Sequence, residues 1–180
     1  TIVRESEVLR SLIDQTLIFS RIERGAQVYT LAEGDVAPVV ASVVDDYREY
    51  LERSGFRVQR TLLDSAPPVR FDPAALSQAV VNLLDNAVKY SGPSRDIAVR
   101  LEAHNGSVVF EVEDHGVGID PSEQRKIFER FYRAANGSGK GAYGVGLFRV
   151  RSILDAHEGG AAADSGPGGG SRSPPGAPAG

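Results

Sequence analysis

Apolar residues recur every three or four positions in several stretches of the chain, a period typical of amphipathic helices. The helices expected are residues 2–24, 37–54, 72–90, 121–130 and 144–157. Gly25 and Gly55 follow the first two stretches, where a glycine can end a helix. Asp72 and Pro73 open the third, because a carboxylate can cap free backbone N–H groups and proline suits the first helical turn.

Between these helices, apolar and polar residues alternate as they do in half-buried strands. The strands expected are residues 56–63, 97–103 and 108–113, with a short extended stretch near 29–31. Asn105 and Gly106 form a strong tight-turn pair, so they predict a hairpin between the second and third strands. Elements in this order predict an α+β fold, a two-layer sandwich with the helices on one face of the sheet.

The two ends of the chain differ from its middle. The regular apolar stripe of residues 2–24 suits a partner helix, within a hairpin or across a dimer, and it equally suits packing on its own domain. From Gly159 onward the composition changes to Gly, Pro, Ala and Ser. Such a segment can bury little apolar surface, so we expect a flexible tail.

Composition limits the classes of function. The 180 residues are 41% hydrophobic and 24% charged, as in a globular protein, and the net charge of -4 carries no signature of nucleic-acid binding. The absence of Cys excludes disulfides and thiolate metal sites and fits the cytoplasm. Neither a signal peptide nor an apolar run of roughly 18 residues is visible. Because the chain begins at Thr1 and has no Met, we expect a fragment of a longer protein.

One polar stripe lies on the helix expected over residues 72–90. Gln78, Asn82, Asn86 and Lys89 are spaced so that they share one side of that helix. A solvated face is the ordinary explanation for a polar stripe, but solvated faces favour Glu, Lys and Arg, and Asn is a weak helix former. An amide oxygen suits Mg²⁺, and a lysine offers a point charge to phosphates. The stripe therefore favours a phosphate and magnesium site.

Two glycine-containing motifs follow. Asp114, Gly116 and Gly118 come directly after the second hairpin strand, where a carboxylate could accept a hydrogen bond from an exocyclic amine such as that of adenine. An ordinary turn would look the same. Gly144, Gly146 and Leu147 lead from a Gly-rich loop into the last helix, whose free N–H groups favour an anion. A plain flexible loop explains that second motif equally well.

The order of these elements resembles a known family. An Asn/Lys helix, a hairpin, D-x-G-x-G, a short helix with two phenylalanines, a Gly-rich loop and G-x-G-L are similar to the N, G1, F and G2 boxes of the GHKL ATPase superfamily. Residues 81–91 are very close to the N box of histidine kinases, and residues 126–133 to their F box. Residues 17–25 resemble the end of the second helix of the dimerisation hairpin.

The resemblance implies a Bergerat-type ATP-binding fold with a mixed sheet, preceded by an N-terminal helix. Residues 1–25 would be part of the dimerisation hairpin, residues 26–160 the catalytic ATP-binding domain and residues 161–180 the flexible tail. The reaction implied is in-line phosphoryl transfer, which depends on positioning and charge neutralisation.

The matching positions also imply a role for each site residue. The nucleotide would be bound by Asn86, Lys89, Tyr90, Asp114, Gly116, Gly118, Lys140, Gly144, Gly146 and Leu147. Asn86 would ligate Mg²⁺ and Asp114 would bind the adenine amine. Residues 134–143 would form the ATP lid. Arg133 and Lys140 would reach the γ-phosphate, and Asn82 would help activate the acceptor histidine.

The chain departs from the family in three places. The acceptor histidine is absent, since His104, His115 and His157 do not lie on a dimerisation helix. Tyr143 stands where the family usually has Thr or Ser. Ser173-Pro174-Pro175 replaces part of a final hydrophobic strand and is not expected to continue a ladder.

We therefore expect the Mg-ATP-binding catalytic domain of a two-component sensor histidine kinase that donates phosphoryl groups to a histidine outside this fragment. Its partners would be ATP or ADP, the dimerisation domain with the acceptor histidine, a response regulator, and a second copy in the full-length protein. A degenerate domain that acts as a nucleotide-regulated protein-binding module is the alternative. Another GHKL branch, such as an anti-sigma serine kinase or an ATP-driven clamp, fits the helix end at residues 21–23 less well.

Overall fold

The computed structural model describes residues 29–132, 144–165, 171–173 and 175–178. The chain divides into two units, residues 1–30 and residues 31–180, and the elements below belong to the second. The helix expected over residues 2–24 lies outside the described residues. In the part of the chain that is described, no helix combines the length and apolarity needed to cross a membrane.

The described elements alternate between helices and strands along the chain. In order they are β1 (Ala32–Gly34), α2 (Ala37–Arg53), β2 (Arg57–Leu62), β3 (Val69–Phe71), α3 (Pro73–Tyr90), β4 (Asp96–His104), β5 (Ser107–Asp114), the 3₁₀ helix η1 (Lys126–Phe128), α4 (Gly146–Ala156), β6 (Gly160–Ala161), β7 (Asp164–Ser165), β8 (Ser171–Ser173) and β9 (Pro175–Pro178). The expected helices at residues 37–54, 72–90 and 144–157 and the expected hairpin are therefore confirmed.

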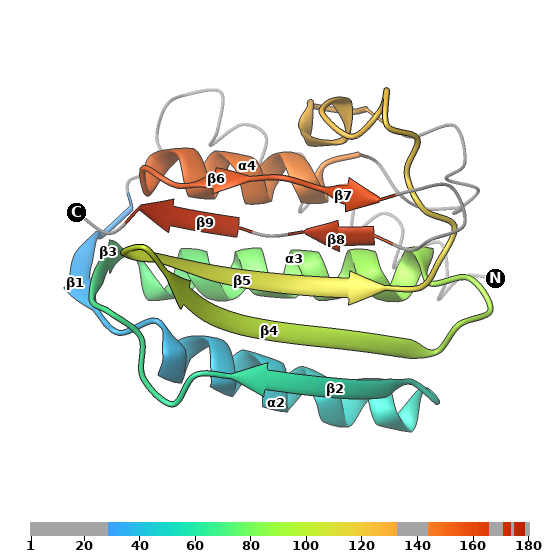
Figure 1. Cartoon of the computed structure of the whole chain (residues 1–180), viewed down its shortest axis with the longest axis horizontal. Coiled ribbons are helices and arrows are strands. Elements are labelled where there is room, and N and C mark those ends of the chain that lie inside the picture. The colour runs from blue at the N-terminus through green and yellow to red at the C-terminus, as the bar shows by residue number, and fades with distance from the viewer. Residues whose placement is uncertain (1–28, 133–143, 166–170, 174, 179–180) are drawn as a thin grey trace, which may run out of the picture. The chain divides into compact units, whose positions relative to one another are not determined.

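The main sheet is mixed and carries helices on one face. Its order is β2-β4-β5-β8-β7, and β9 pairs with both β5 and β6. β2 runs parallel to β4, whereas β4 and β5 are antiparallel. Helices α2, α3 and α4 lie behind this sheet and contact β2, β5 and β6 respectively (Figure 1). A separate pair, β1 and β3, forms a short antiparallel ribbon. The predicted α+β sandwich is confirmed.

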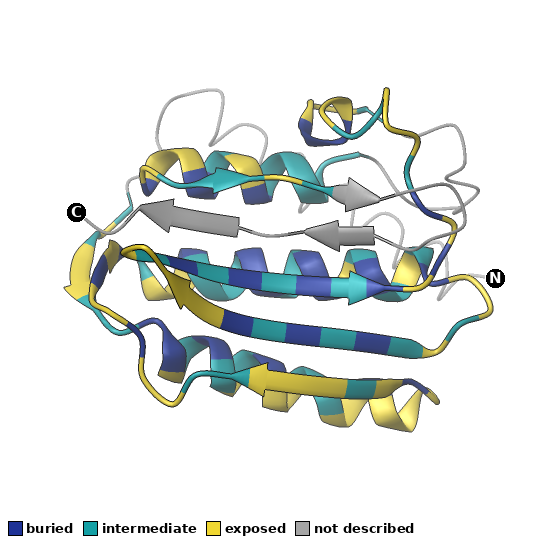
Figure 2. Ribbon diagram, viewed as in Figure 1, coloured by how far each residue is buried: buried dark blue, intermediate teal, exposed yellow. Residues whose placement is uncertain are grey.

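The core lies between the helix layer and the sheet. β5 alternates buried and partly exposed residues along its length, and β4 does so up to Leu101, after which its residues are exposed (Figure 2). Their helix-facing residues are Ile97, Val99, Leu101, Val108, Phe110 and Val112, and α3 contributes Ala79, Val80, Leu83, Leu84 and Ala87. The period of two on the strands and the period near 3.6 on the helix therefore meet in one apolar layer.

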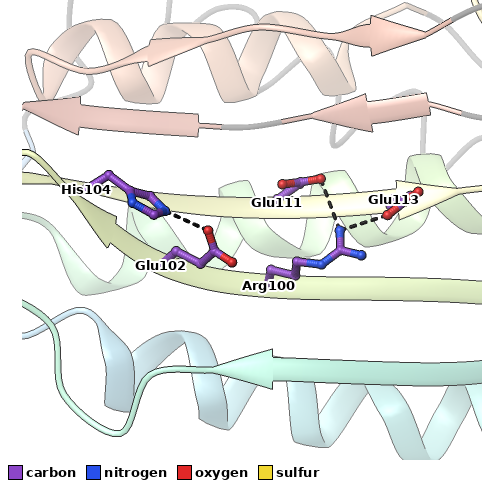
Figure 3. A network of polar contacts seen from close by, with 5 residues as sticks. All are labelled: Arg100, Glu102, His104, Glu111 and Glu113. Carbon is purple, nitrogen blue, oxygen red and sulfur yellow. Dashed lines mark hydrogen bonds and ion pairs between the residues drawn. The ribbon is translucent and has the colours of Figure 1, made fainter.

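The other face of the sheet carries paired charges. Arg100 of β4 donates to Glu111 at 3.2 Å and to Glu113 at 2.8 Å, both on β5 (Figure 3). The hydrogen bond to Glu113 raises the pKa of the Arg100 guanidinium above its usual value. Nearby, Glu102 and His104 are in contact at 2.7 Å. These residues stabilise the hairpin from the face opposite helices α2, α3 and α4.

The start of α3 is joined to the end of α4. The Asp72 carboxylate accepts hydrogen bonds from the backbone N–H groups of Ala74 and Ala75, so it is the expected N-cap. The backbone N–H of Asp72 donates to Nε2 of His157 at 2.9 Å. Nδ1 of His157 lies 2.6 Å from the carbonyl oxygen of Ile153. His157 therefore carries its hydrogen on Nδ1 and bridges the two helices.

Two local expectations need correction, and one strand was missed. The extended stretch near residues 29–31 is replaced by β1 at Ala32–Gly34, which pairs with β3 (Val69–Phe71), a strand that the pattern did not predict. Only Lys126–Phe128 of the helix expected over residues 121–130 is helical, as one 3₁₀ turn. Just before it, the Asp120 carboxylate accepts from the N–H and hydroxyl of Ser122, and such local hydrogen bonds favour turns over helix.

The expectation that the tail does not continue the ladder of the sheet is wrong for its described residues. β8 and β9 both pair antiparallel with β5, with Val112 opposite Ser173 and Val109 opposite Gly176. β5 buries every second side chain, and the backbone groups along its second edge need hydrogen-bond partners. Gly, Ala, Ser and Pro residues can supply backbone partners without apolar side chains. Pro175 and Pro178 are the first and last residues of β9, so the two positions without an N–H group lie at the ends of this short stretch of ladder.

Candidate functional site

The side chains of Asn82 and Asn86 meet the start of α4. A Cβ atom built on Gly146 would lie 3.6 Å from Nδ2 and 3.7 Å from Oδ1 of Asn86, and 3.8 Å from Oδ1 of Asn82. Nδ2 of each asparagine is buried, and neither has a hydrogen-bond partner within the described residues. Buried amide groups normally have partners, so this pair is typical of a site that binds a polar ligand. A solvated helix face does not explain it.

The first turn of α4 adds backbone donors to these amides. Val145 occupies the N-cap position, and its apolar side chain cannot accept a hydrogen bond from the helix. The first N–H groups of α4 therefore rely on other partners, and the helix dipole favours an anion at this end. Gly146, which was expected to bind the nucleotide, lies here beside the two asparagines, and Leu147 follows it in the first turn of α4.

The loop after β5 lies directly against the end of α3. A Cβ atom on Gly116 would be 1.8 Å from the carbonyl oxygen of Tyr90, a distance that no side chain can adopt. The N–H of Val117 donates to the same oxygen at 3.2 Å. Gly118 has a φ of 70°, in the left-handed region that favours glycine. Both glycines of D-x-G-x-G are therefore required by the backbone geometry.

Asp114 is a buried carboxylate at the end of β5. Its exposed fraction is 6%, and Oδ1 accepts a hydrogen bond from the N–H of Gly116 at 2.9 Å. This bond fixes the orientation of the carboxylate relative to the loop that contacts Tyr90. A buried, oriented acceptor can discriminate between ligands, because a ligand without the matching donor leaves it poorly satisfied.

The residues that flank the expected lid, Phe131 and Tyr132 before it and Gly144 after it, are in contact. The N–H of Phe131 donates to the carbonyl oxygen of Gly144 at 3.1 Å, and a Cβ on Gly144 would lie 2.5 Å from the carbonyl oxygen of Tyr132. The Tyr132 hydroxyl donates to Glu123 at 2.7 Å, which raises the pKa of Tyr132 to about 12. Arg133, Lys140 and Tyr143 lie outside the described residues, so their predicted roles stay predictions.

Two residues near the site were missed by the sequence reasoning. The hydroxyl of Tyr47 on α2 donates a hydrogen bond to Asp85 on α3. Partial burial raises the pKa of the Asp85 carboxyl, and the ammonium group of Lys89 opposes that change. The four-residue spacing of Asp85 and Lys89 was a visible signal for their pairing. The contact with Tyr47 had no sequence signal, because the two residues are 38 positions apart.

The chemistry of the site limits how it could hold a metal ion. Within the described residues no group of three or more His, Cys, Asp or Glu side chains is arranged to bind a metal. A magnesium ion would therefore depend on amide oxygens, water and ligand phosphates, which is its usual pattern in phosphate sites. Asn86 can supply such an oxygen. Lys89, whose Nζ is 5.7 Å from the Tyr90 ring centroid, lies on the same stripe.

Residues 71–173 match the family of histidine kinase-, DNA gyrase B-, and HSP90-like ATPases. The chain belongs to this family. The alginate biosynthesis sensor protein KinB of Pseudomonas aeruginosa is 32% identical, over 96% of this chain and 29% of that protein. The histidine-protein kinase/phosphatase MprB of Mycolicibacterium paratuberculosis is 38% identical, over 72% of this chain and 26% of that protein.

Solved structures agree with this membership. Full-length ShkA in complex with AMPPNP matches with a TM-score of 0.82 and 27% identity, over 99% of this chain and 37% of that one. The resemblance to the catalytic domain of sensor histidine kinases is thus confirmed. The chain spans less than a third of the length of KinB or MprB, at 29% and 26%.

Proposed function

We propose that this chain binds Mg-ATP as the catalytic domain of a two-component sensor histidine kinase. The observation that carries the proposal is the pair of buried asparagine Nδ2 groups beside the first turn of α4. Buried donors are not normally left without acceptors, and the oxygens of a bound polyphosphate would accept hydrogen bonds from them, while the Oδ1 atoms could face its cation.

Asn86 is the proposed magnesium ligand. Its amide oxygen is a hard, neutral donor, and the same side chain lies within 3.7 Å of the position where a Cβ on Gly146 would stand. A magnesium ion bound there would neutralise charge on the phosphate oxygens during transfer. The backbone N–H groups at Gly146 and Leu147 would bind the phosphates beside it, with Lys89 as a further positive charge.

Asp114 is the proposed adenine ligand. Its carboxylate is buried and oriented by Gly116, and the loop from Gly116 to Gly118 can approach a flat ring closely. An exocyclic amine would donate to the carboxylate, whereas the carbonyl that guanine carries at the corresponding position would repel it. Tyr90, at the end of α3 beside this loop, would contact the base or sugar.

The proposed reaction is in-line transfer of the γ-phosphoryl group to a histidine outside this chain. Asn82 lies beside Asn86 and is the proposed group that orients the acceptor, and Arg133 and Lys140 would bind the γ-phosphate. His104 is exposed and bonded to Glu102, and His157 is buried between α3 and α4. Positioning supplies most of the rate in such reactions, so the domain needs the dimerisation helices to present an acceptor.

The remaining parts follow from the same proposal. Residues 1–25 would belong to the dimerisation hairpin, and the full-length protein would be a homodimer that passes its phosphoryl group to a response regulator. Two departures from the family, Tyr143 and a tail that is not expected to complete the sheet, favour the alternative of a degenerate protein-binding module. Because β8 and β9 pair with β5, the tail no longer favours that alternative.

Calorimetric titration with ATP, with and without magnesium, tests the proposal. We expect magnesium-dependent binding in the range of about 1 μM to 1 mM, the usual range for enzyme substrates. Asn86→Ala should abolish the metal dependence, and Asp114→Ala should abolish the preference for ATP over GTP. Each removes one partner of a buried contact, at a cost of about 1–3 kcal/mol.

The two variants are controls for each other. Asn86→Ala should keep the preference for adenine, and Asp114→Ala should keep the dependence on magnesium, because the two side chains contact different parts of the nucleotide. Equal ATP affinity in the wild type and both variants would contradict the assignment of this site. Tight binding without any metal effect would contradict the role of Asn86 alone.

A further inference from the structure

Tyr47 connects α2 to the helix that carries the proposed phosphate ligands. Its hydroxyl donates a hydrogen bond to Asp85 of α3, one position before Asn86. The Tyr47 ring is half-buried and meets the ring of Tyr50 edge-on, with the centroids 5.6 Å apart. This neighbour restricts the ring and so the direction of the hydroxyl group. The hydrogen bond is therefore a direct side-chain contact between the two helices.

Asp85 also interacts with Lys89, one helical turn further along α3. Residues four apart lie on the same side of a helix, and the Lys89 ammonium stabilises the ionised Asp85 carboxylate. Lys89 is also the cation on the stripe of Asn82 and Asn86. A phosphate bound by that stripe and the carboxylate of Asp85 thus compete for the same positive charge.

We propose that Tyr47 is a positioning residue for phosphate binding that acts through Asp85 on Lys89. By donating to Asp85, Tyr47 holds the carboxylate toward α2 and compensates part of its charge. Because Asp85 then attracts the Lys89 ammonium less strongly, Lys89 interacts more strongly with the bound phosphates. This inference rests on the nucleotide binding proposed above and adds a residue that contacts neither the nucleotide nor the metal.

Two substitutions should change ATP affinity in opposite directions. Tyr47→Phe removes the donor and lets Asp85 turn to Lys89, so the Kd for ATP should rise about two- to fivefold, the scale of exposed ion pairs. Asp85→Asn removes the competing charge, so the Kd should fall by a similar factor. Both changes should shrink at high salt, because the charges lie near the surface.

A double-mutant cycle distinguishes this from a role in packing alone. In the Asp85→Asn background, Tyr47→Phe should have no further effect on ATP affinity, because the charge that Tyr47 holds is gone. In the Lys89→Gln background, both substitutions should lose their effect. Asp46→Asn removes one exposed charge next to Tyr47 and is the matched control, which should bind ATP as the wild type does.

The experiment is calorimetry on the full chain, with the unfolding temperature of each variant measured in parallel. A lower unfolding temperature for Tyr47→Phe with unchanged ATP affinity would overturn the inference, because the contact would then be purely structural. An unchanged effect of Tyr47→Phe in the Lys89→Gln background would also overturn it. If the wild type binds no nucleotide, both the proposed function and this inference fail. If the wild type binds ATP but the effects of Tyr47→Phe and Asp85→Asn simply add, the two residues are not coupled and only this inference fails.

Discussion

The two neighbours of β5 differ sharply in composition. On one side, β4 pairs with β5 along eight residues, and Ile97, Val99 and Leu101 of β4 are all buried. On the other side, β8 and β9 each pair with three residues of β5, and residues 159–180 contain no apolar side chain larger than proline. The comparison shows that backbone pairing and core packing are separate contributions. A strand can complete a sheet while adding little apolar burial.

The largest effect on the free energy of unfolding is expected in the apolar core that β4 and β5 share. Phe110 lies at the centre of β5, is 4% exposed and packs into the layer beneath the helices. Phe110→Ala should reduce the free energy of unfolding by about 3–5 kcal/mol, because it removes a buried ring and leaves a cavity. Urea denaturation measures this change. A loss below about 1 kcal/mol would mean that the core collapses around the site or is less well packed than the burial indicates.

An intermediate effect is expected when the tail strands are removed. A chain ending at residue 170 lacks β8 and β9. The backbone groups along that edge of β5 would then form hydrogen bonds with water instead of with these strands. We expect a loss of about 1–3 kcal/mol, since each backbone hydrogen bond contributes roughly 0.5–1.5 kcal/mol net.

The same denaturation experiment applies to the truncated chain, and a chain ending at residue 178 keeps both strands and is the control. A loss as large as that for Phe110→Ala would show that the tail contributes to the core after all. Magnesium-dependent ATP binding should survive the truncation, because the proposed ligands lie on α3, α4 and the loop after β5.

The smallest effect on stability is expected on the face of the sheet opposite helices α2, α3 and α4. Arg100→Gln removes the cation between Glu111 and Glu113, whose side chains are about one-fifth exposed, at 18% and 24%. Ion pairs near the surface contribute little, so the free energy of unfolding should fall by about 1 kcal/mol or less.

The cost of Arg100→Gln should also fall as salt is added, because screening weakens repulsion between the two glutamates. Glu113→Gln in the Arg100→Gln background is the matched control, since it removes that repulsion and should recover part of the loss. A salt-independent loss of several kcal/mol would contradict the description of this cluster as a surface contribution.

The outcome of the sequence reasoning follows the range of the interactions involved. The cap of α3 and the turn of the hairpin depend on residues that are neighbours in sequence, and both were predicted correctly. β3 was missed because its three residues acquire strand structure only by pairing with β1, more than 30 residues earlier. The helix expected over residues 121–130 failed because Asp120 and Ser122 favour a local turn.

In the candidate site, too, features that depend on nearby residues were predicted and contacts between distant residues were not. Asn82, Asn86 and Lys89 were identified from their spacing, and Asp114 with its glycines from their position after a strand. Their spacing could not show that the amides are buried beneath Gly146, which is 60 residues from Asn86 in the sequence. Tyr47 was missed for the same reason, because only the packing of α2 on α3 brings its hydroxyl to Asp85.

The sequence by itself determined helices α2, α3 and α4, the hairpin and the fold class, and it suggested the residues of the proposed nucleotide site. These depend on periodicity, caps and turns, which are local properties of the chain. The tertiary structure alone decided that Gly116 must lack a side chain against Tyr90 and that the tail pairs with β5. Those features arise from contacts between distant segments, and they depend on close approach and unsatisfied backbone groups, which no sequence period records.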